Sequence, residues 1–494
     1  MMLGGRFTLF LVCWVVSFGV DASVTGLIQD AETKEALPYA NITVLGKYKG
    51  TVANAEGRYV LDLEGIAATD TVLFTYMGYQ TFKITAARLQ EVEIIALQPV
   101  AVKLSEVQVL SKVYSAEQII ELVEKNFEKN YSAPPTSQQL FCHKYSLFPV
   151  KNGNKVMVKQ SDFPGLDKNV FNGLLKKLPN EFIGYQDAIV ALYTKGAEHK
   201  LVPIKAISLE EGSQQALMKE FEGKLGGFMA DFEKTNESKD QYYKIRTGIL
   251  SHKIGKGETD WDVYKEDSLH YTVQTDLIKS ELLFLYHDYT RLESKNWEFI
   301  TSPHKYLYRL EETTILNDEL VYKISFKPKG RGLFQGMLYV STSTFAILQL
   351  DFSFEQGRQT EKIQLFGLGH AMNFKGAHVL FEKGRQGYFV KYLSVHQNES
   401  ASVDRDFVLV KKQKRLLLDK ELNELKLQVD VAFDIQSSWE VLLLDREEIE
   451  AQQFDKIEQP SFMKFKKEYV YTPEMWGNHT VLAPTSELAK YRRR

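Results

Sequence analysis

Few residues in this chain have the types and the spacing that enzyme chemistry requires. His396 and Glu399 form a His-x-x-Glu pair, which could supply two ligands of a zinc ion if a distant histidine supplied the third. Only one histidine, His479, follows the pair, so the chain behind it is too short for a peptidase core. We therefore interpret His396 and Glu399 as a chance match at the end of a strand, where a polar loop begins.

The other candidate groups are weaker. Cys142 and His143 are neighbours in a strand-like run, and neighbouring strand residues point to opposite faces, which disfavours a Cys-His dyad and favours a structural thiol. His370 and His378 have a spacing that fits neither a helix face nor a compact metal site. The nucleophile elbow, the phosphate loop and the His-Glu-x-x-His motif are missing from the sequence. We therefore predict no catalytic residue, no metal ligand and no cofactor, and we expect a protein that is not an enzyme.

The first 22 residues predict export. Arg6 is followed by the apolar run FTLFLVCWVVSFGV and then by the small residues Ala22 and Ser23, the pattern of a cleaved signal peptide. The run is shorter than the roughly 20 apolar residues of a membrane-spanning helix, which disfavours an anchor. Cys13 lies inside the run, not at the cleavage point, which disfavours a lipoprotein. We expect residues 1–22 to be removed and the mature protein to lie in the periplasm or on the periplasmic face of the outer membrane.

Composition limits the partners of the mature chain. The 61 basic and 64 acidic residues give a net charge of -3, which gives no reason to expect a nucleic acid as partner. With 494 residues, of which 44% are hydrophobic, the chain can build two or three domains. Cys142 is the only cysteine after residue 22, so no disulfide within the mature chain can stabilise it. Its stability must come from buried apolar surface.

The region after the signal peptide has the pattern of an all-β module. Short β-branched runs alternate with turn residues, which is typical of a β-sandwich. Gly50 and Gly57 bracket a hairpin connection where we expect positive φ, and Gly78 suits a tight turn. Seven strands are predicted, at Ser23 to Asp30, Ala40 to Leu45, Gly57 to Leu63, Thr71 to Met77, Gln80 to Ile84, Glu91 to Leu97 and Ser105 to Leu110.

This pattern resembles the carboxypeptidase-regulatory-like, or transthyretin-like, domain of exported Bacteroidota proteins. The matching positions are Gly26, Pro38, Ala40, Asn41, Gly50, Thr51, Gly57, Tyr59, Gly78 and Tyr79. The resemblance implies a β-sandwich at residues 23–98 that serves as an accessory module, followed by a linker strand at 99–114. This chain departs from the family by having Val52, Ala53 and Asn54 where Thr-Asp usually follows the Gly-Thr pair.

Beyond residue 114 the apolar period becomes helical. Ser115 and Gln118 form a capping box for a helix over Ser115 to Asn130, and the run QQLFCHKYSLF after it predicts a strand. The buried face of that helix is predicted to carry Ile119, Ile120, Val123 and Phe127. This order resembles the region after the regulatory domain in uncharacterised Bacteroidota envelope proteins. Those proteins have an aromatic-Tyr-Arg-Glu strand where this chain has Phe141, Cys142, His143 and Lys144.

Residues 115–494 are therefore predicted to form a larger α+β domain. A helical insertion is expected at about 166–236, where apolar residues such as Leu217, Phe221 and Leu225 recur at helical spacing. Aromatic-rich strands at about 260–396 predict a curved antiparallel sheet. Within it, VYKISFKPKGRGLFQGMLYVSTSTFAILQLDFSF has a Lys-Ile-x-Phe strand followed by Gly-x-Leu-Tyr-Val. This order resembles the half-barrel sheets of periplasmic lipoprotein carriers. The fold class that we expect is mainly β with helices, a seven-stranded β-sandwich followed by this α+β domain.

Three functions remain open. The first is a non-catalytic, exported cell-envelope protein that acts as an interaction or binding scaffold. The second is a periplasmic carrier of a lipid or another apolar ligand, which requires the concave face of the sheet to be open instead of filled by helices. The third is a hydrolase with an unrecognised site. Expected partners are envelope proteins or an apolar ligand, and no nucleic acid. Trp476 is predicted to dock onto the sheet, and Arg492 to Arg494 could give peripheral contact with the outer membrane through anionic lipid headgroups.

Overall fold

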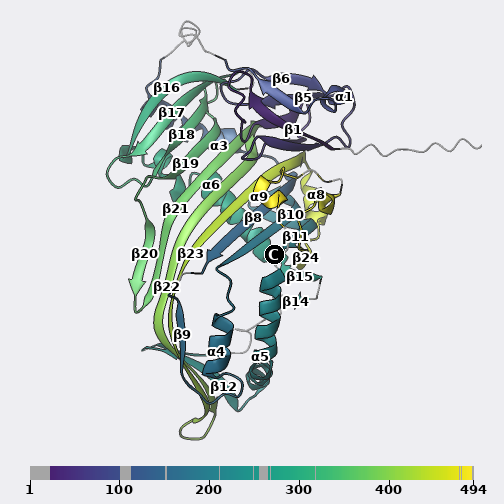
Figure 1. Ribbon diagram of the computed structural model, residues 1–494. Helices are drawn as coiled ribbons and strands as arrows, with labels where there is room; N and C mark the ends of the chain where they lie inside the picture. Colours follow the sequence, from purple (N-terminus) through teal and green to yellow (C-terminus); the bar gives the residue numbers. More distant parts are fainter. Residues whose placement is uncertain are drawn as a thin grey trace, which may run out of the picture.

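The structure, a computed structural model, describes residues 23–100, 113–150, 153–210, 212–248, 250–254, 265–266, 269–316, 319–477, 479 and 481–491. The molecule is elongated (Figure 1). A small β-sandwich lies at one end, a large curved sheet forms the body, and the hairpin that joins the two longest strands reaches the opposite end (Figure 1). The predicted signal peptide, the run Ser105 to Leu110 and Arg492 to Arg494 lie outside the described residues.

The sandwich consists of two small sheets. Its strands are β1 (Ser23–Asp30), β2 (Asn41–Val44), β3 (Gly50–Val52), β4 (Arg58–Asp62), β5 (Thr71–Thr75), β6 (Phe82–Thr85) and β7 (Ile94–Leu97), with the short helix α1 (Ala86–Leu89) before β7. One sheet has the order β4-β1-β7 and the other the order β3-β2-β5-β6. Apolar side chains of both sheets, including Ile28, Ile42 and Phe74, share one buried core. The predicted seven-stranded sandwich is confirmed.

In the part of the chain that the structure describes, the seventh strand is β3. The sequence did not predict it, because a run of three residues that begins with a glycine has the pattern of a turn. Gly57 and Gly78 have the expected positive φ, at 74° and 82°. Gly50 does not have a positive φ. A glycine is needed there because of close packing, since a Cβ at this position would lie 2.1 Å from the carbonyl oxygen of Ile42 on β2.

Over the residues described, the body of the molecule is one sheet of seventeen strands. They are β8 (Thr136–Pro149), β9 (Lys155–Ser161), β10 (Glu181–Lys195), β11 (Glu198–Leu209), β12 (Gln241–Thr247), β13 (Leu250–Lys253), β14 (Lys265–Glu266), β15 (His270–Gln274), β16 (Tyr306–Leu316), β17 (Glu319–Pro328), β18 (Phe334–Ser341), β19 (Ile347–Phe354), β20 (Thr360–Leu365), β21 (Leu368–Lys383), β22 (Tyr388–Gln413), β23 (Lys420–Glu448) and β24 (Phe462–Glu468). Neighbouring strands are antiparallel except for β11 and β24, which pair in parallel. The sheet is curved, as predicted, and mixed (Figure 1).

Helices lie mainly against the sheet and, along the chain, in the connections between its strands. The α-helices after the sandwich are α3 (Ala116–Tyr131), α4 (Lys168–Leu175), α5 (Gly212–Glu237), α6 (Thr275–Thr290), α7 (Glu298–Thr301), α8 (Ala451–Lys456) and α9 (Ser486–Ala489), and the 3-10 turns are η2 (Lys295–Trp297), η3 (Pro303–Lys305) and η4 (Pro473–Trp476). The predicted helix α3 is confirmed, with its capping box between Ser115 and Gln118 and with all four predicted face residues buried. No helix among the residues described is both long enough and apolar enough to span a membrane.

Two of the predicted ranges need correction. The stretch 166–236 is helical only at its ends, in α4 and α5, and its middle is the hairpin of β10 and β11. The sheet also extends far beyond 260–396, from β8 to β24. The middle of β10, from Ala188 to Leu192, is buried on both faces. Its apolar residues therefore do not alternate with polar ones, and the strand period is hidden in the sequence.

The main core lies on the concave face of the sheet. Phe127 of α3 packs on Trp297 of η2, with ring centroids 5.5 Å apart, and Phe299 of α7 stacks on Phe326 of β17 at 4.5 Å. Helix α6 adds further apolar side chains to the same cluster. Trp476 docks on the sheet as predicted, edge-on to Phe141 of β8. This contact belongs to a separate cluster of buried residues.

Candidate functional site

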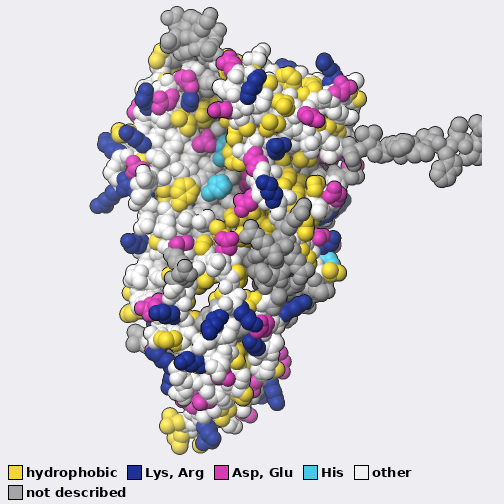
Figure 2. Space-filling view, viewed as in Figure 1, with side chains coloured by type: hydrophobic (Ala, Val, Ile, Leu, Met, Phe, Trp, Pro, Cys, Tyr) yellow, Lys and Arg dark blue, Asp and Glu magenta, His cyan; other side chains and the backbone are white. Residues whose placement is uncertain are grey.

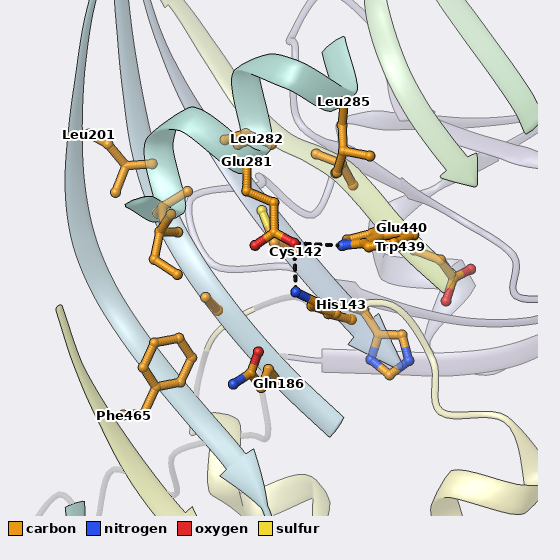
Figure 3. Close-up of a pocket in the computed structure, with 15 residues that line it drawn as sticks. Cys142, His143, Gln186, Leu201, Glu281, Leu282, Leu285, Trp439, Glu440 and Phe465 are labelled. Atoms are coloured by element: carbon orange, nitrogen blue, oxygen red, sulfur yellow. Dashed lines mark hydrogen bonds and ion pairs between the residues drawn. The ribbon is translucent and has the colours of Figure 1, made fainter. Parts of the chain in front are cut away.

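The concave face is closed by its own helices. Under α6 a cavity of about 60 Å³ remains between the helix and strands β8, β10, β11, β23 and β24 (Figure 3). Its wall is largely apolar, and a polar group lies at one side, where Glu281 of α6 accepts hydrogen bonds from Lys144 Nζ at 2.6 Å and from Trp439 Nε1 at 3.1 Å (Figure 3). Ligand pockets in proteins usually have several hundred cubic ångströms. This cavity is therefore a gap in a packed core.

Cys142 lies at this cavity as a free thiol. Burial, with a smaller contribution from the charge of Glu281, raises the pKa of its thiol to about 12. Because the thiolate is the nucleophile, a thiol with this pKa is inert at neutral pH. Its neighbour His143 bonds instead to Asp187 and faces the C-terminal segment around Trp476.

A row of polar side chains crosses the opposite, outer face of the sheet. The row runs over six neighbouring strands, β19, β21, β22, β23, β8 and β10, in which each member is directly paired with the next. Directly paired residues of antiparallel strands lie on the same face. Its members, in this order, are Asp351, His378, Ser394, Glu440, His143 and Asp187. We refer to them as the outer row.

Two carboxylate–histidine pairs lie at the ends of the outer row. His143 Nδ1 donates to Asp187 Oδ1 at 2.6 Å, and His378 Nδ1 bonds to Asp351 Oδ1. Burial alone would lower the pKa of His143, but the charge and hydrogen bond of Asp187 outweigh burial and raise it to about 9. Burial alone would likewise raise the pKa of Asp351, but His378 brings it below its usual value. The imidazole of His143 is therefore protonated at neutral pH.

The sandwich lies over part of the outer row. Tyr39, in the loop before β2, packs its ring on His378 at 4.7 Å and on Tyr392 at 5.6 Å. Its φ of 61° is unusual for a residue with a side chain and costs on the order of 1 kcal/mol. Burial, together with the charges of Glu440 and Asp351, raises the pKa of Tyr39 to about 12. Tyr39 is therefore fixed as a neutral aromatic contact between the two regions.

Further contacts attach the sandwich to the body. Tyr48 packs edge-on to Phe389 at 5.5 Å, and the guanidinium of Arg446 lies over both rings. Asn54 accepts hydrogen bonds from two backbone amides of its own turn and donates to the carbonyl oxygens of Ala483 and Pro484. The asparagine at which this chain departs from the family pattern thus both caps its turn and binds the C-terminal segment.

A cleft of about 790 Å³ remains open where the sandwich does not cover the sheet. Figure 2 shows histidine side chains in a hollow of the surface between the sandwich and the sheet. Both regions supply aromatic side chains to the cleft, and Asp351 and His378 of the outer row form part of its floor. The aromatic side chains are Tyr39, Tyr76, Tyr339 and Phe374, whereas the rings of Phe326 and Phe352, which also border the cleft, are buried in the core on the concave face. A second cavity, of about 760 Å³, lies between β1, β4 and the C-terminal segment.

The residues singled out in the sequence do not form one site. Residues three apart on a strand point to opposite faces, so His396 and Glu399 of β22 cannot share a metal ion. His396 Nε2 lies 3.2 Å from Ser394 Oγ, and Glu399 bonds to His370 instead. Among the residues that the structure describes, no group of three or more histidine, cysteine or acidic side chains could hold a metal ion.

Comparison with known families identifies two parts of the chain. Residues 24–109 match the model of the CarboxypepD_reg-like domain. This region is a CarboxypepD_reg-like domain. Residues 301–412, from β16 to the end of β22, match the model of a family of unknown function, DUF5686. No curated protein sequence matches the chain.

Solved structures give only remote likenesses. A putative outer membrane lipoprotein-sorting protein domain from Vibrio parahaemolyticus is 8% identical, with 69% of this chain and 97% of that chain covered and a TM-score of 0.22. The MucA/MucB complex of Pseudomonas aeruginosa is 8% identical, with 67% and 99% covered and a TM-score of 0.17. At such TM-scores the likenesses support no inference about this chain.

Proposed function

We propose that this chain is a non-catalytic binding scaffold of the cell envelope, which holds a segment of a partner protein in the cleft between the CarboxypepD_reg-like domain and the outer face of the sheet. One observation carries the proposal. The concave face is filled by α3, α6 and α7, whereas the cleft is open and has a volume within the usual range of ligand sites. The predicted signal peptide supports an envelope location.

The chemistry of the cleft favours a polypeptide over a charged small molecule. Aromatic rings of both regions offer apolar contact area at low entropic cost, as in protein interfaces. Gln335, Gln349 and Ser353 provide hydrogen-bonding groups along the same strands. No lysine or arginine is among the described residues that line the cleft, which disfavours a phosphate or a carboxylate-rich ligand. An extended segment with apolar side chains fits this combination.

A carrier function would need a different conformation. The cavity under α6 has about 60 Å³, far less than an acyl chain or another lipid-sized ligand requires. Helix α6 would have to leave the sheet, which would expose Leu282, Leu285 and Tyr289, all buried now. The filled concave face therefore favours the scaffold over the carrier.

Hydrolysis is disfavoured by the burial and the hydrogen bonds of the candidate catalytic groups. Ser394 and His396 are within hydrogen-bonding distance, but Ser394 is 1% exposed, and a nucleophile must reach its substrate. Burial lowers the pKa of His396, and no carboxylate hydrogen bond orients its ring among the contacts of the described residues. These features support a scaffold that performs no reaction.

Site-specific photo-crosslinking tests the proposal. A photoreactive phenylalanine analogue replaces Tyr339 in the cleft of the full chain, in cells that produce the protein naturally, and a matched variant carries it at Phe284, an exposed residue of α6. We expect one defined protein adduct from position 339, reduced by Phe374→Ala, and none from position 284. Identical adducts from both positions, or lipid adducts only, would contradict the proposal.

A further inference from the structure

The turn between β22 and β23 carries three consecutive exposed leucines. Leu416, Leu417 and Leu418 are 104%, 92% and 85% exposed, the highest values among the large apolar side chains apart from Val113. The turn lies at the end of the molecule opposite to the sandwich (Figure 1). A contiguous apolar tip of this kind is uncommon on a soluble monomer and marks an interaction site. We refer to residues 414–420 as the leucine tip.

The leucines project because the rest of the turn is fixed. The β12 strand pairs with β22 as far as Gln413, the last residue before the tip. The hydroxyl of Tyr242 on β12 donates to Asp419 at 2.6 Å, and the backbone amide of Arg415 donates to the same carboxylate. Asp419 is thus held by two internal hydrogen bonds, whereas the three leucines are exposed.

Basic side chains surround the leucines. The stretch 411–421 contains five basic and two acidic residues. Lys414, Arg415 and Lys420 form no ion pair with any carboxylate in the described part of the chain, whereas Lys411 and Lys412 are paired with Asp231 and Glu421. Figure 2 shows hydrophobic and basic side chains together at this end of the molecule. The leucines are therefore an apolar projection surrounded by basic side chains, and we refer to Lys414, Arg415 and Lys420 as the collar.

We infer that the leucine tip inserts into the surface of a membrane that contains anionic lipids. Apolar side chains that enter the boundary between headgroups and acyl chains, next to lysine and arginine that contact the headgroups, are the elements of interfacial binding. A protein groove is the less suitable occupant, because the collar carries unpaired charge that an apolar groove would have to desolvate. The residues of this contact are not those of the contact predicted at Arg492 to Arg494.

This contact would orient the whole chain. Because the tip and the sandwich lie at opposite ends, the cleft would face away from the membrane that holds the tip (Figure 1). The inference does not depend on the proposed scaffold function, since the two sites share no residue. A failure of one leaves the other intact.

Vesicle binding of residues 23–494 tests the inference. Co-sedimentation is measured with vesicles of phosphatidylcholine mixed with phosphatidylglycerol and with vesicles of phosphatidylcholine alone. The test variant is Leu416→Ser/Leu417→Ser/Leu418→Ser. The matched control is Leu365→Ser/Leu368→Ser, which removes exposed leucines from the β20–β21 hairpin. We expect the triple variant to lose affinity for the mixed vesicles on the order of 100-fold and the control to bind like the parent chain.

The charges and the depth of insertion are tested separately. We expect Lys414→Gln and Arg415→Gln each to weaken binding to the mixed vesicles about fivefold and to reduce its salt dependence. A polarity-sensitive dye at Leu417→Cys should shift to the blue on vesicle binding, and one at Leu365→Cys should not. Binding that survives the triple leucine change, equal loss in the control, or a dye at position 417 that stays in water would each overturn the inference.

Discussion

The two faces of the same sheet differ in how tightly they are covered by other elements. On the concave face, α3, α6 and α7 interlock with the strands, and aromatic rings such as Trp297 and Phe299 leave a gap of only about 60 Å³. On the outer face, the sandwich is attached at separate points, and a cleft of about 790 Å³ stays open between them. The curved shape alone would suggest a ligand on the concave face. The packing indicates that this face stabilises the fold and that the open space lies on the outer face.

The largest expected difference between the faces is in stability. Trp297→Ala should destabilise the protein by about 3–5 kcal/mol, because it removes a fully buried ring from the concave core. Tyr339→Ala in the cleft should cost less than about 1 kcal/mol, because part of its ring is already in contact with solvent. Urea unfolding of both variants measures the difference. Equal losses would mean that the two faces are packed to the same degree.

The outer row should make stability depend on pH. The pKa of His143 rises from 6.5 to about 9 on folding, so the stabilisation from its pair with Asp187 is complete below pH 6.5 and is lost as the pH rises through 9. The loss should be about 3 kcal/mol at most. We expect Asp187→Asn to be less stable than the parent at pH 6 and to lack this decline at alkaline pH.

A control for this pH effect lies on the same sheet. Glu399→Gln removes the partner of His370, a pair that is about one third exposed and therefore screened by solvent. It should leave the alkaline decline unchanged. If Asp187→Asn and the parent lose stability in parallel between pH 6.5 and 9, the pair does not act as described.

A smaller effect on stability should distinguish the sandwich from the body. Asn54→Ala removes the side chain that caps its turn and that binds Ala483 and Pro484, at a cost of about 1–2 kcal/mol. Amide exchange in β3 and β4 should become faster, while the concave core stays protected. The control Asn373→Ala, at an asparagine whose hydrogen bond with Gln359 is exposed to solvent, should change neither. Faster exchange throughout the molecule would mean that the two regions unfold as one unit.

Local features of this fold could be predicted from the sequence, and the candidate site could not. The capping box at Ser115 and Gln118 and the buried face of α3 depend on contacts within one turn or two, which the sequence displays directly. The strand β10 was missed because burial on both faces removes the alternation that marks a strand. The glycine at 50 was recognised as special, but its reason is contact with β2.

The outer row depends on strand register, which no local pattern fixes here. Asp187 and Asp351 are far apart in the sequence, and each meets its histidine only through the pairing of β8 with β10 and of β19 with β21. The sequence did display one pair, His396 and Glu399. Their side chains point to opposite faces of the sheet, because side chains alternate along a strand. A signal such as covariation between Asp187 and His143 could have revealed the row.

Hydrogen exchange of α6 in the intact mature chain tests the central claim most directly, namely that the concave face is a filled core. Measured by mass spectrometry, amides of α6 such as those of Leu282 and Leu285 should exchange as slowly as those of the strands beneath, and the native mass should be that of the polypeptide alone. Fast exchange of α6 as a separate unit, together with a bound lipid-sized mass, would contradict the account and identify the helix as the lid of a carrier.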